Sequence, residues 1–207
     1  MSALVIQLSK MTWADYWHVV TEPELVAADK VTILSAALAS AFNTVFGLLM
    51  AWILTRYQFP GKTLLNGLMD LPFALPTAVA GLTLAGIFST TGWYGEWLAQ
   101  FGIKVSYTWL GIAVAMAFTS IPFVIRTVQP VLEELGPEYE EAAETLGARP
   151  WQAFYRVILP EVAPALLAGT ALSFTRSLGE FGAVIFIAGN IAWKTEVISL
   201  MIFIRQQ

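Results

Sequence analysis

Long apolar stretches alternate with short polar segments along this chain. Asp, Glu, Lys and Arg are absent from three of these stretches: 31–55, 71–91 and 105–125. A helix rises about 1.5 Å per residue, so each stretch can cross a hydrocarbon core about 30 Å thick. A fourth stretch, 162–188, is interrupted only by Arg176, Glu180 and weakly polar residues. The pattern predicts an all-α fold, a polytopic bundle of transmembrane helices.

The pattern is incomplete at both ends of the chain. Segment 1–8 has the composition of a helix's last turns, and 197–207 is the start of a further span. The whole of segment 1–30 is predicted to be external. Trp13 and Trp17 give it an amphipathic spacing that suits either the membrane surface or packing against other helices. We therefore expect an internal fragment of a single membrane domain, without internal repeats.

Composition excludes several functions. Hydrophobic residues make up 57% of the chain and charged residues only 13%, which is too apolar for an ordinary soluble domain. A net charge of −4 argues against nucleic acid as a partner. The chain has no cysteine and one histidine, His18, so a metal site or histidine-based catalysis has no support. Gly61-Lys62-Thr63 lacks the first glycine of a phosphate-binding loop, because position 56 is arginine, and we expect no ATP site here.

The segment 126–161 is polar and carries a regular pattern. Pro137 can start a short helix and Gly147 can end it in the left-handed conformation. Within it, an apolar face recurs at helical spacing, opposite glutamates: Tyr139, Ala142, Ala143 and Leu146. A second helix is predicted from Pro150 to just before Pro160. A solvated acidic helix would explain the charges, but not the fixed glycine and Leu-Pro spacing.

This pattern resembles the EAA loop of importer-type ABC permeases, whose consensus has Glu-Ala-Ala, then Gly, then Ile-x-Leu-Pro at the same spacing. Only Val157 departs from it, standing where the consensus has isoleucine. The resemblance implies a cytoplasmic loop that couples the permease to an ATPase. The residues it implicates in coupling are Glu141, Ala142, Ala143, Leu146, Gly147, Leu159 and Pro160.

Two charges lie deep in the fourth predicted span. Arg176 and Glu180 are four residues apart and can pair along one helix face. Charged residues at a helix centre cost roughly 2.5 to 3.5 kcal/mol each to insert, so they usually face a bundle interior or a wet cavity. The pair either fixes helix packing alone or contributes, with Ser177, to an anion pathway or gate.

Two further features have a structural and a functional interpretation. Pro72 and Pro76 interrupt the second predicted span, which predicts either a kinked helix or a break that lines a pore or gate. Small residues recur every four positions on the fourth span and predict close helix packing, within the subunit or with a second one: Ala165, Gly169, Ser173 and Ser177.

A wider resemblance covers essentially the whole chain. Segments 71–76, 126–130 and 173–183 are similar to the oxyanion branch of these permeases, nearest to T-type subunits of sulfate/thiosulfate importers, with molybdate permeases next. The phrase from Arg176 to Gly182 occurs in both groups, so it does not choose between sulfate and molybdate or tungstate. The six spans of the family imply that the first span and much of the last are missing from this chain.

The same resemblance implies a type I ABC importer assembly in the bacterial inner membrane. Its expected partners are a homologous W-type permease, a cytoplasmic ATPase dimer and a periplasmic sulfate-binding protein. ATP and Mg²⁺ would bind the ATPase, with no cofactor on this chain. The positive-inside rule barely separates the two faces, so the resemblance carries the orientation. Tryptophans then gather near predicted external ends, as an interfacial aromatic belt requires.

Two rival functions remain open at this point. An ion-coupled secondary anion transporter would use Arg176 and Glu180 as its substrate and proton site, but such proteins often contain internal repeats. A membrane-embedded enzyme lacks a credible nucleophile, metal cluster or acid–base pair in this sequence.

Overall fold

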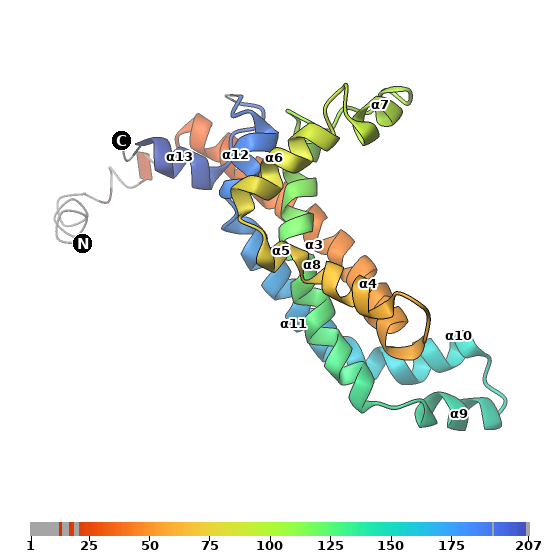
Figure 1. Cartoon of the computed structure of the whole chain (residues 1–207). Coiled ribbons are helices and arrows are strands. Elements are labelled where there is room, and N and C mark those ends of the chain that lie inside the picture. Colours follow the sequence, from red (N-terminus) through yellow and green to blue (C-terminus); the bar gives the residue numbers. More distant parts are fainter. Residues whose placement is uncertain (1–12, 14–16, 19–20, 192, 206–207) are drawn as a thin grey trace.

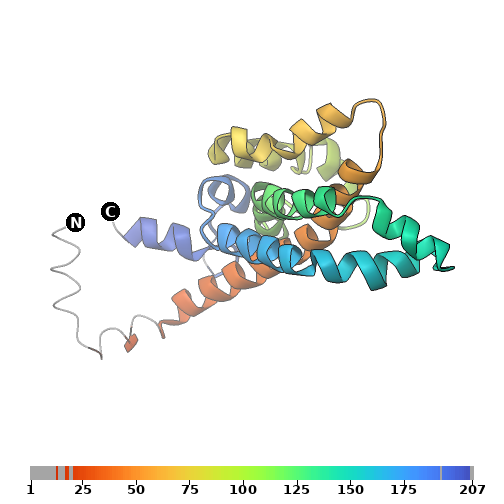
Figure 2. The ribbon, with the colours of Figure 1, turned by 90° about the horizontal axis from the view of Figure 1, so that it is seen from below.

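The computed structural model describes residues 13, 17–18, 21–191 and 193–205. Three helices in this part of the chain are long and apolar enough to cross a membrane: α3 (Pro23–Arg56), α8 (Trp109–Glu134) and the continuous run Pro150–Leu178. Figures 1 and 2 show them side by side. The described residues contain helices and no strand, which confirms the all-α membrane fold. The predicted helix end at 1–8 lies outside the described residues.

Two long helices extend beyond the predicted spans. α3 begins at Pro23, eight residues before the predicted span, so Asp29 and Lys30 lie on its early turns. α8 runs on from the predicted span to Glu134, through Arg126 and Pro130. Arginine is a good helix former, and Asp70 pairs with the Arg126 charge at 2.6 Å between Nη2 and Oδ2. The polar segment that follows α8 is therefore shorter than the sequence predicts.

The predicted helix end before Pro160 is wrong. α10 (Pro150–Ala153), the π-helical turn η1 (Phe154–Ile158) and α11 (Leu159–Leu178) form one uninterrupted helical run. In the π turn, the Leu159 amide donates to the Phe154 carbonyl, five residues back instead of four. This wider turn changes the hydrogen-bond register just before the proline, which has no N–H to donate. Segment 126–161 is called the coupling loop below, after its predicted role, and its two helical arms are α9 (Glu138–Thr145) and the run from Pro150 to Pro160. The second arm therefore continues directly into a membrane helix.

Small residues bring the three long helices close together. A Cβ on Gly47 would lie 2.7 Å from Val124 Cγ1, and one on Gly169 would lie 3.0 Å from Val124 Cα. One turn further along α11, Ser173 is fully buried and accepts a hydrogen bond from Asn43 Nδ2 (3.1 Å). Ser177 shares a bond with Ser120 at 3.0 Å between the hydroxyl oxygens. The small-residue stripe therefore packs within this subunit, against α3 and α8.

Two of the predicted spans are broken helices. The second predicted span consists of α5 (Leu71–Ala74) and α6 (Thr77–Ile87), separated at Leu75 and Pro76. In the fourth predicted span, α11 ends at Leu178, and α12 (Gly182–Ala188) follows after three non-helical residues. The remaining helices are short: α4 (Lys62–Met69), α7 (Trp93–Ala99), α9 (Glu138–Thr145) and α13 (Ile198–Arg205).

The two ends of the bundle differ in character. α9 and α10 extend from one end, whereas α7, α12 and α13 lie at the other (Figure 1). Tryptophans at the α7 end are largely exposed: Trp93, Trp97, Trp109 and Trp193. This arrangement agrees with the predicted aromatic belt at one membrane interface.

Candidate functional site

The first arm of the coupling loop is α9, and its ends have the predicted chemistry. Pro137 is the residue that precedes the first helical turn, and three glutamates follow it within that turn. Carboxylates are favourable there because the N-terminus of a helix carries partial positive charge. At the other end Gly147 has φ +84°, and the Ala148 amide donates to the Ala143 carbonyl (3.0 Å). The left-handed glycine thus turns the chain towards α10.

The apolar side of this loop is uncovered. Leu146 is 88% exposed, and Tyr139 on the same helix and Trp151 on α10 are also exposed. A groove of about 330 Å³ lies between the two arms, with small residues from Ala143 to Ala153 among its walls. An isolated large apolar side chain on the surface is ordinary, but Leu146 lines a groove whose walls are mostly small or apolar residues, and such a surface suits a protein partner.

The predicted coupling residues occupy different parts of the loop. Glu141 and Ala142 are exposed on α9, and Ala143 lines the groove. Leu159 is half-buried against the cluster of buried residues where α3, α8 and α11 meet, and Pro160 is exposed beside it. The Glu-Ala-Ala end of the loop is therefore exposed, whereas its Leu-Pro end packs against the helix bundle.

One arginine, not identified as a site residue from sequence, joins the loop to α3. Arg56, the last residue of α3, donates from Nε to Glu140 Oε1 on α9 at 2.7 Å. Its Nη1 and Nη2 donate to the carbonyls of Leu132 and Gly136, both at 3.0 Å. The sequence shows only a charge ending an apolar stretch, because the partners are 76 to 84 residues away.

The second part of the site consists of the two helix breaks, which the structure brings together. α6 and α12, the helices that follow the breaks, pack against each other. A Cβ on Gly182, the first residue of α12, would collide with Thr77 Oγ1 at the start of α6. One turn into α6, a Cβ on Gly81 would collide with the backbone of Ala183. Broken membrane helices that meet in this way expose backbone groups between spans, where transporters place their pathways.

The predicted ion pair lies directly at the second break. Arg176 Nη1 is 2.7 Å from Glu180 Oε2, and the Glu180 side chain is only 1% exposed, against 32% for Arg176. Glu180 Oε1 accepts a hydrogen bond from the Ala183 amide (2.9 Å), so the carboxylate also caps α12. Among the described residues, Glu180 is the only ion-pair partner of the Arg176 guanidinium. Its other N–H groups are directed to neither a carboxylate nor a carbonyl of this part of the chain.

The other residues predicted for the pathway are placed differently. Ser177 is fully buried and bonded to Ser120, so it belongs to the helix interface beside the pair. Pro72 is buried and Pro76 is exposed at the start of α6. The sequence located the break and the charges correctly, but it gave no signal that Ser177 faces α8.

A second arginine fixes the corner that precedes the first break. Arg126 on α8 donates from Nε and Nη2 to the two oxygens of Asp70, at 2.7 and 2.6 Å. It also donates from Nη1 to the side chains of Asn66 and Gln129. This bidentate pair ties the corner between α4 and α5 to α8. From sequence, 126–130 is notable only as a segment of family resemblance.

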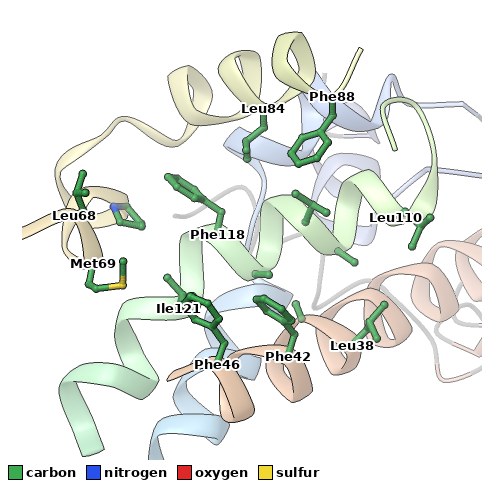
Figure 3. A pocket seen from close by; sticks show the side chains of 15 residues that line it. Leu38, Phe42, Phe46, Leu68, Met69, Leu84, Phe88, Leu110, Phe118 and Ile121 are labelled. Atoms are coloured by element: carbon green, nitrogen blue, oxygen red, sulfur yellow. The ribbon is translucent and has the colours of Figure 1, made fainter. Parts of the chain in front are cut away.

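An apolar groove of about 570 Å³ borders the same break (Figure 3). Its walls come from α3, α8 and the α4 to α6 segment, and all of its lining residues are apolar, Phe42, Phe46 and Phe118 among them. Pro72 forms part of this wall. An anion in this groove would lose its hydration without gaining a hydrogen-bond donor, so the groove does not suit an oxyanion.

Enlarging Gly81 is expected to separate the two helix breaks. Gly81→Ala places a methyl group against the Ala183 backbone, so α6 must move away from α12. We expect a loss of stability of about 1–3 kcal/mol and a lower melting temperature of the purified protein. Gly86→Ala on the same helix meets nothing within 4 Å and is the matched control. It should hold or raise the melting temperature, because alanine favours helix. Equal melting of the two variants would contradict the close packing of the breaks.

These features together define a class of protein: a helical membrane transport component, with an exposed polar loop at one end and paired helix breaks between its spans. Residues 43–205 match the family described as "Binding-protein-dependent transport system inner membrane component". The chain belongs to this family, and the predicted resemblance to ABC importer permeases is confirmed. It is therefore an inner-membrane transport component.

Curated relatives agree with this assignment. The chain is 79% identical over 207 residues to the sulfate transport system permease protein CysT of Escherichia coli strain K12, covering 100% of this chain and 75% of the relative. It is 78% identical over 207 residues to the protein of the same name from Salmonella typhimurium, with the same coverage. A third protein of that name, from Synechocystis, is 46% identical over 204 residues, covering 99% of this chain and 71% of the relative.

Proposed function

We propose that this chain is a permease subunit of an ATP-driven importer for sulfate and thiosulfate, and that it forms half of the translocation pore. The observation that carries the proposal is the 79% identity, over the full chain, to a sulfate transport system permease. The Arg176 guanidinium, whose one ion-pair partner among the described residues is Glu180, lies at a helix break and supplies N–H donors that suit a tetrahedral dianion.

The partners follow from this assignment. A homologous W-type permease would complete the pore, a cytoplasmic ATPase dimer would bind the loop from α9 to Pro160, and a periplasmic sulfate-binding protein would deliver the anion. ATP and Mg²⁺ would bind the ATPase subunits, and this chain would carry neither an ATP site nor a cofactor. The exposed Leu146 and the small-residue groove beside it support a protein partner at this loop.

The mechanism would use the rigid connection between the loop and the spans. Closure of the ATPase dimer on ATP would move α9 and α10. Because α10, η1 and α11 are one helical run, that movement would reach Arg176 and the second helix break without a flexible joint. The two breaks, packed against each other here, would then separate or rotate to open the pathway to the other side.

Competition for uptake tests the substrate. Cells that carry the complete permease and its partner subunits should take up radiolabelled sulfate, and unlabelled thiosulfate should inhibit that uptake. Molybdate at the same concentration should compete weakly. Strong competition by molybdate and weak competition by thiosulfate would assign the chain to the molybdate and tungstate permeases instead. The binding protein is expected to set most of this selectivity, because the anions have the same charge and nearly the same shape.

A further inference from the structure

The end of α3 touches both arms of the coupling loop. Towards the first arm, Arg56 forms its ion pair with Glu140 on α9 at 2.7 Å. Towards the second arm, the Trp52 ring meets Phe154 of η1 edge to face, with centroids 5.2 Å apart. The Arg56 guanidinium in turn lies over the Trp52 ring, 5.5 Å from its centroid. One turn of α3 thus connects α9, the guanidinium, the indole and η1 in a continuous chain of contacts.

Arg56 also fixes the angle at which α9 leaves α8. The carbonyl of Leu132 lies in the last turn of α8, where backbone acceptors have no partner within the helix. The carbonyl of Gly136 belongs to the turn between the two helices, and Glu140 lies in the first turn of α9. A single planar guanidinium therefore bonds to the end of one helix, the turn and the start of the next. Because its N–H donors have fixed directions, the guanidinium sets the relative orientation of α8 and α9 as well as neutralising Glu140.

These contacts are sheltered from water. The Arg56 side chain is 12% exposed and that of Glu140 is 26% exposed. A charge-assisted hydrogen bond in this setting is stronger than one between fully solvated side chains, which contributes little. The bond between Arg56 and Glu140 can therefore stay intact when α9 moves, so that α3 moves with it.

We propose that Arg56 is a positioning residue for the coupling of ATP hydrolysis to transport. Through it, α3 would move together with both arms of the loop. The inference rests on the proposed function, because it assumes that an ATPase moves this loop. It adds a route in which α9 acts on α3 through Arg56 and Glu140, beside the direct path along α10 and α11. Glu140 then has a role distinct from that of its exposed neighbour Glu141, which remains available to the partner.

The test compares ATP hydrolysis with transport in the complete importer reconstituted in vesicles. Glu140→Gln should raise the ATP hydrolysed per sulfate transported about tenfold, the loss expected for one charge-assisted bond. Arg56→Gln should raise it at least as much, because it also removes the bonds to the carbonyls of Leu132 and Gly136. Because both variants remove the same link, the double variant should be no worse than Arg56→Gln alone. Glu134→Gln, which neutralises an exposed carboxylate at the end of α8, should leave the ratio unchanged.

The ratio of ATP hydrolysed to sulfate transported distinguishes a positioning role of Arg56 from a purely structural one. If Arg56 only stabilised the fold, the variants would lower hydrolysis and uptake in proportion and keep the wild-type ratio, which would overturn the inference. Additive effects of the two substitutions would overturn it as well. A wild-type complex that failed to transport sulfate would instead count against the proposed function. A normal ratio in a transporting Arg56→Gln complex counts against this inference alone.

Discussion

Replacing Gly147 with valine is expected to lower sulfate uptake at least tenfold and to release the ATPase from the purified complex. Gly147 has φ +84°, a conformation that costs a β-branched residue about 1–3 kcal/mol. The strain would be relieved by rotating the turn between α9 and α10, which would reshape the groove and move Leu146. Uptake and copurification of the ATPase, both at matched permease amounts, measure the effect.

Gly102→Val is the matched control for this prediction. Gly102 has φ +71°, and a Cβ there meets nothing within 4 Å, as at Gly147, but it follows α7 at the opposite end of the bundle. The same backbone strain outside the coupling loop should change uptake less than twofold. Equal losses in the two variants would mean that strain alone, and not the loop's shape, is responsible.

Neutralising both members of the ion pair is expected to abolish most transport while leaving the protein folded. Glu180→Ala alone should destabilise the protein by about 1–3 kcal/mol, because it removes the acceptor for the buried Ala183 amide, whereas Arg176 is 32% exposed. The double variant Arg176→Gln/Glu180→Gln avoids this cost, since neutral amides replace both charges and the amide oxygen at position 180 can still accept from the Ala183 amide. It should assemble normally but transport at least tenfold less, because the pathway has lost its guanidinium.

The double variant distinguishes the two interpretations of the pair that the sequence leaves open. If the pair only fixes helix packing, a folded neutral variant should transport at the wild-type rate. Uptake should be measured together with the melting temperature and the yield of the complex, so that a loss of protein is not mistaken for a loss of transport. Normal uptake with normal assembly would remove Arg176 from the anion pathway.

Local features of this protein were predictable from sequence. Gly147 ends α9 in the left-handed conformation as predicted, because a helix end and its glycine are neighbours in the chain. The break after Pro72 and the pairing of Arg176 with Glu180 were predictable for the same reason. Each depends on residues within about one helical turn.

Features that depend on distant partners could not be predicted. Nothing near Arg56 or Arg126 in sequence indicates that one clamps the coupling loop and the other fixes the corner before the first helix break, because Glu140 and Asp70 are 84 and 56 residues away. A break in the second predicted span was one of two expected alternatives, the break after Leu178 was not expected, and the contact between the two breaks is a product of tertiary packing. The helix end wrongly placed before Pro160 has a local cause, a π turn that sequence patterns with a period of 3.6 residues do not register.

The central claim is that the loop from α9 to Pro160 is the surface that receives the ATPase. The most direct test is a photo-crosslinking residue at position 146, where the leucine is 88% exposed, in the complete permease with its partners. The control is the same substitution at Leu167, which is 71% exposed on the membrane-spanning part of α11. We expect a cross-link to the ATP-binding subunit from position 146 and none from position 167. An assembled, transporting complex without that cross-link from position 146 would contradict it.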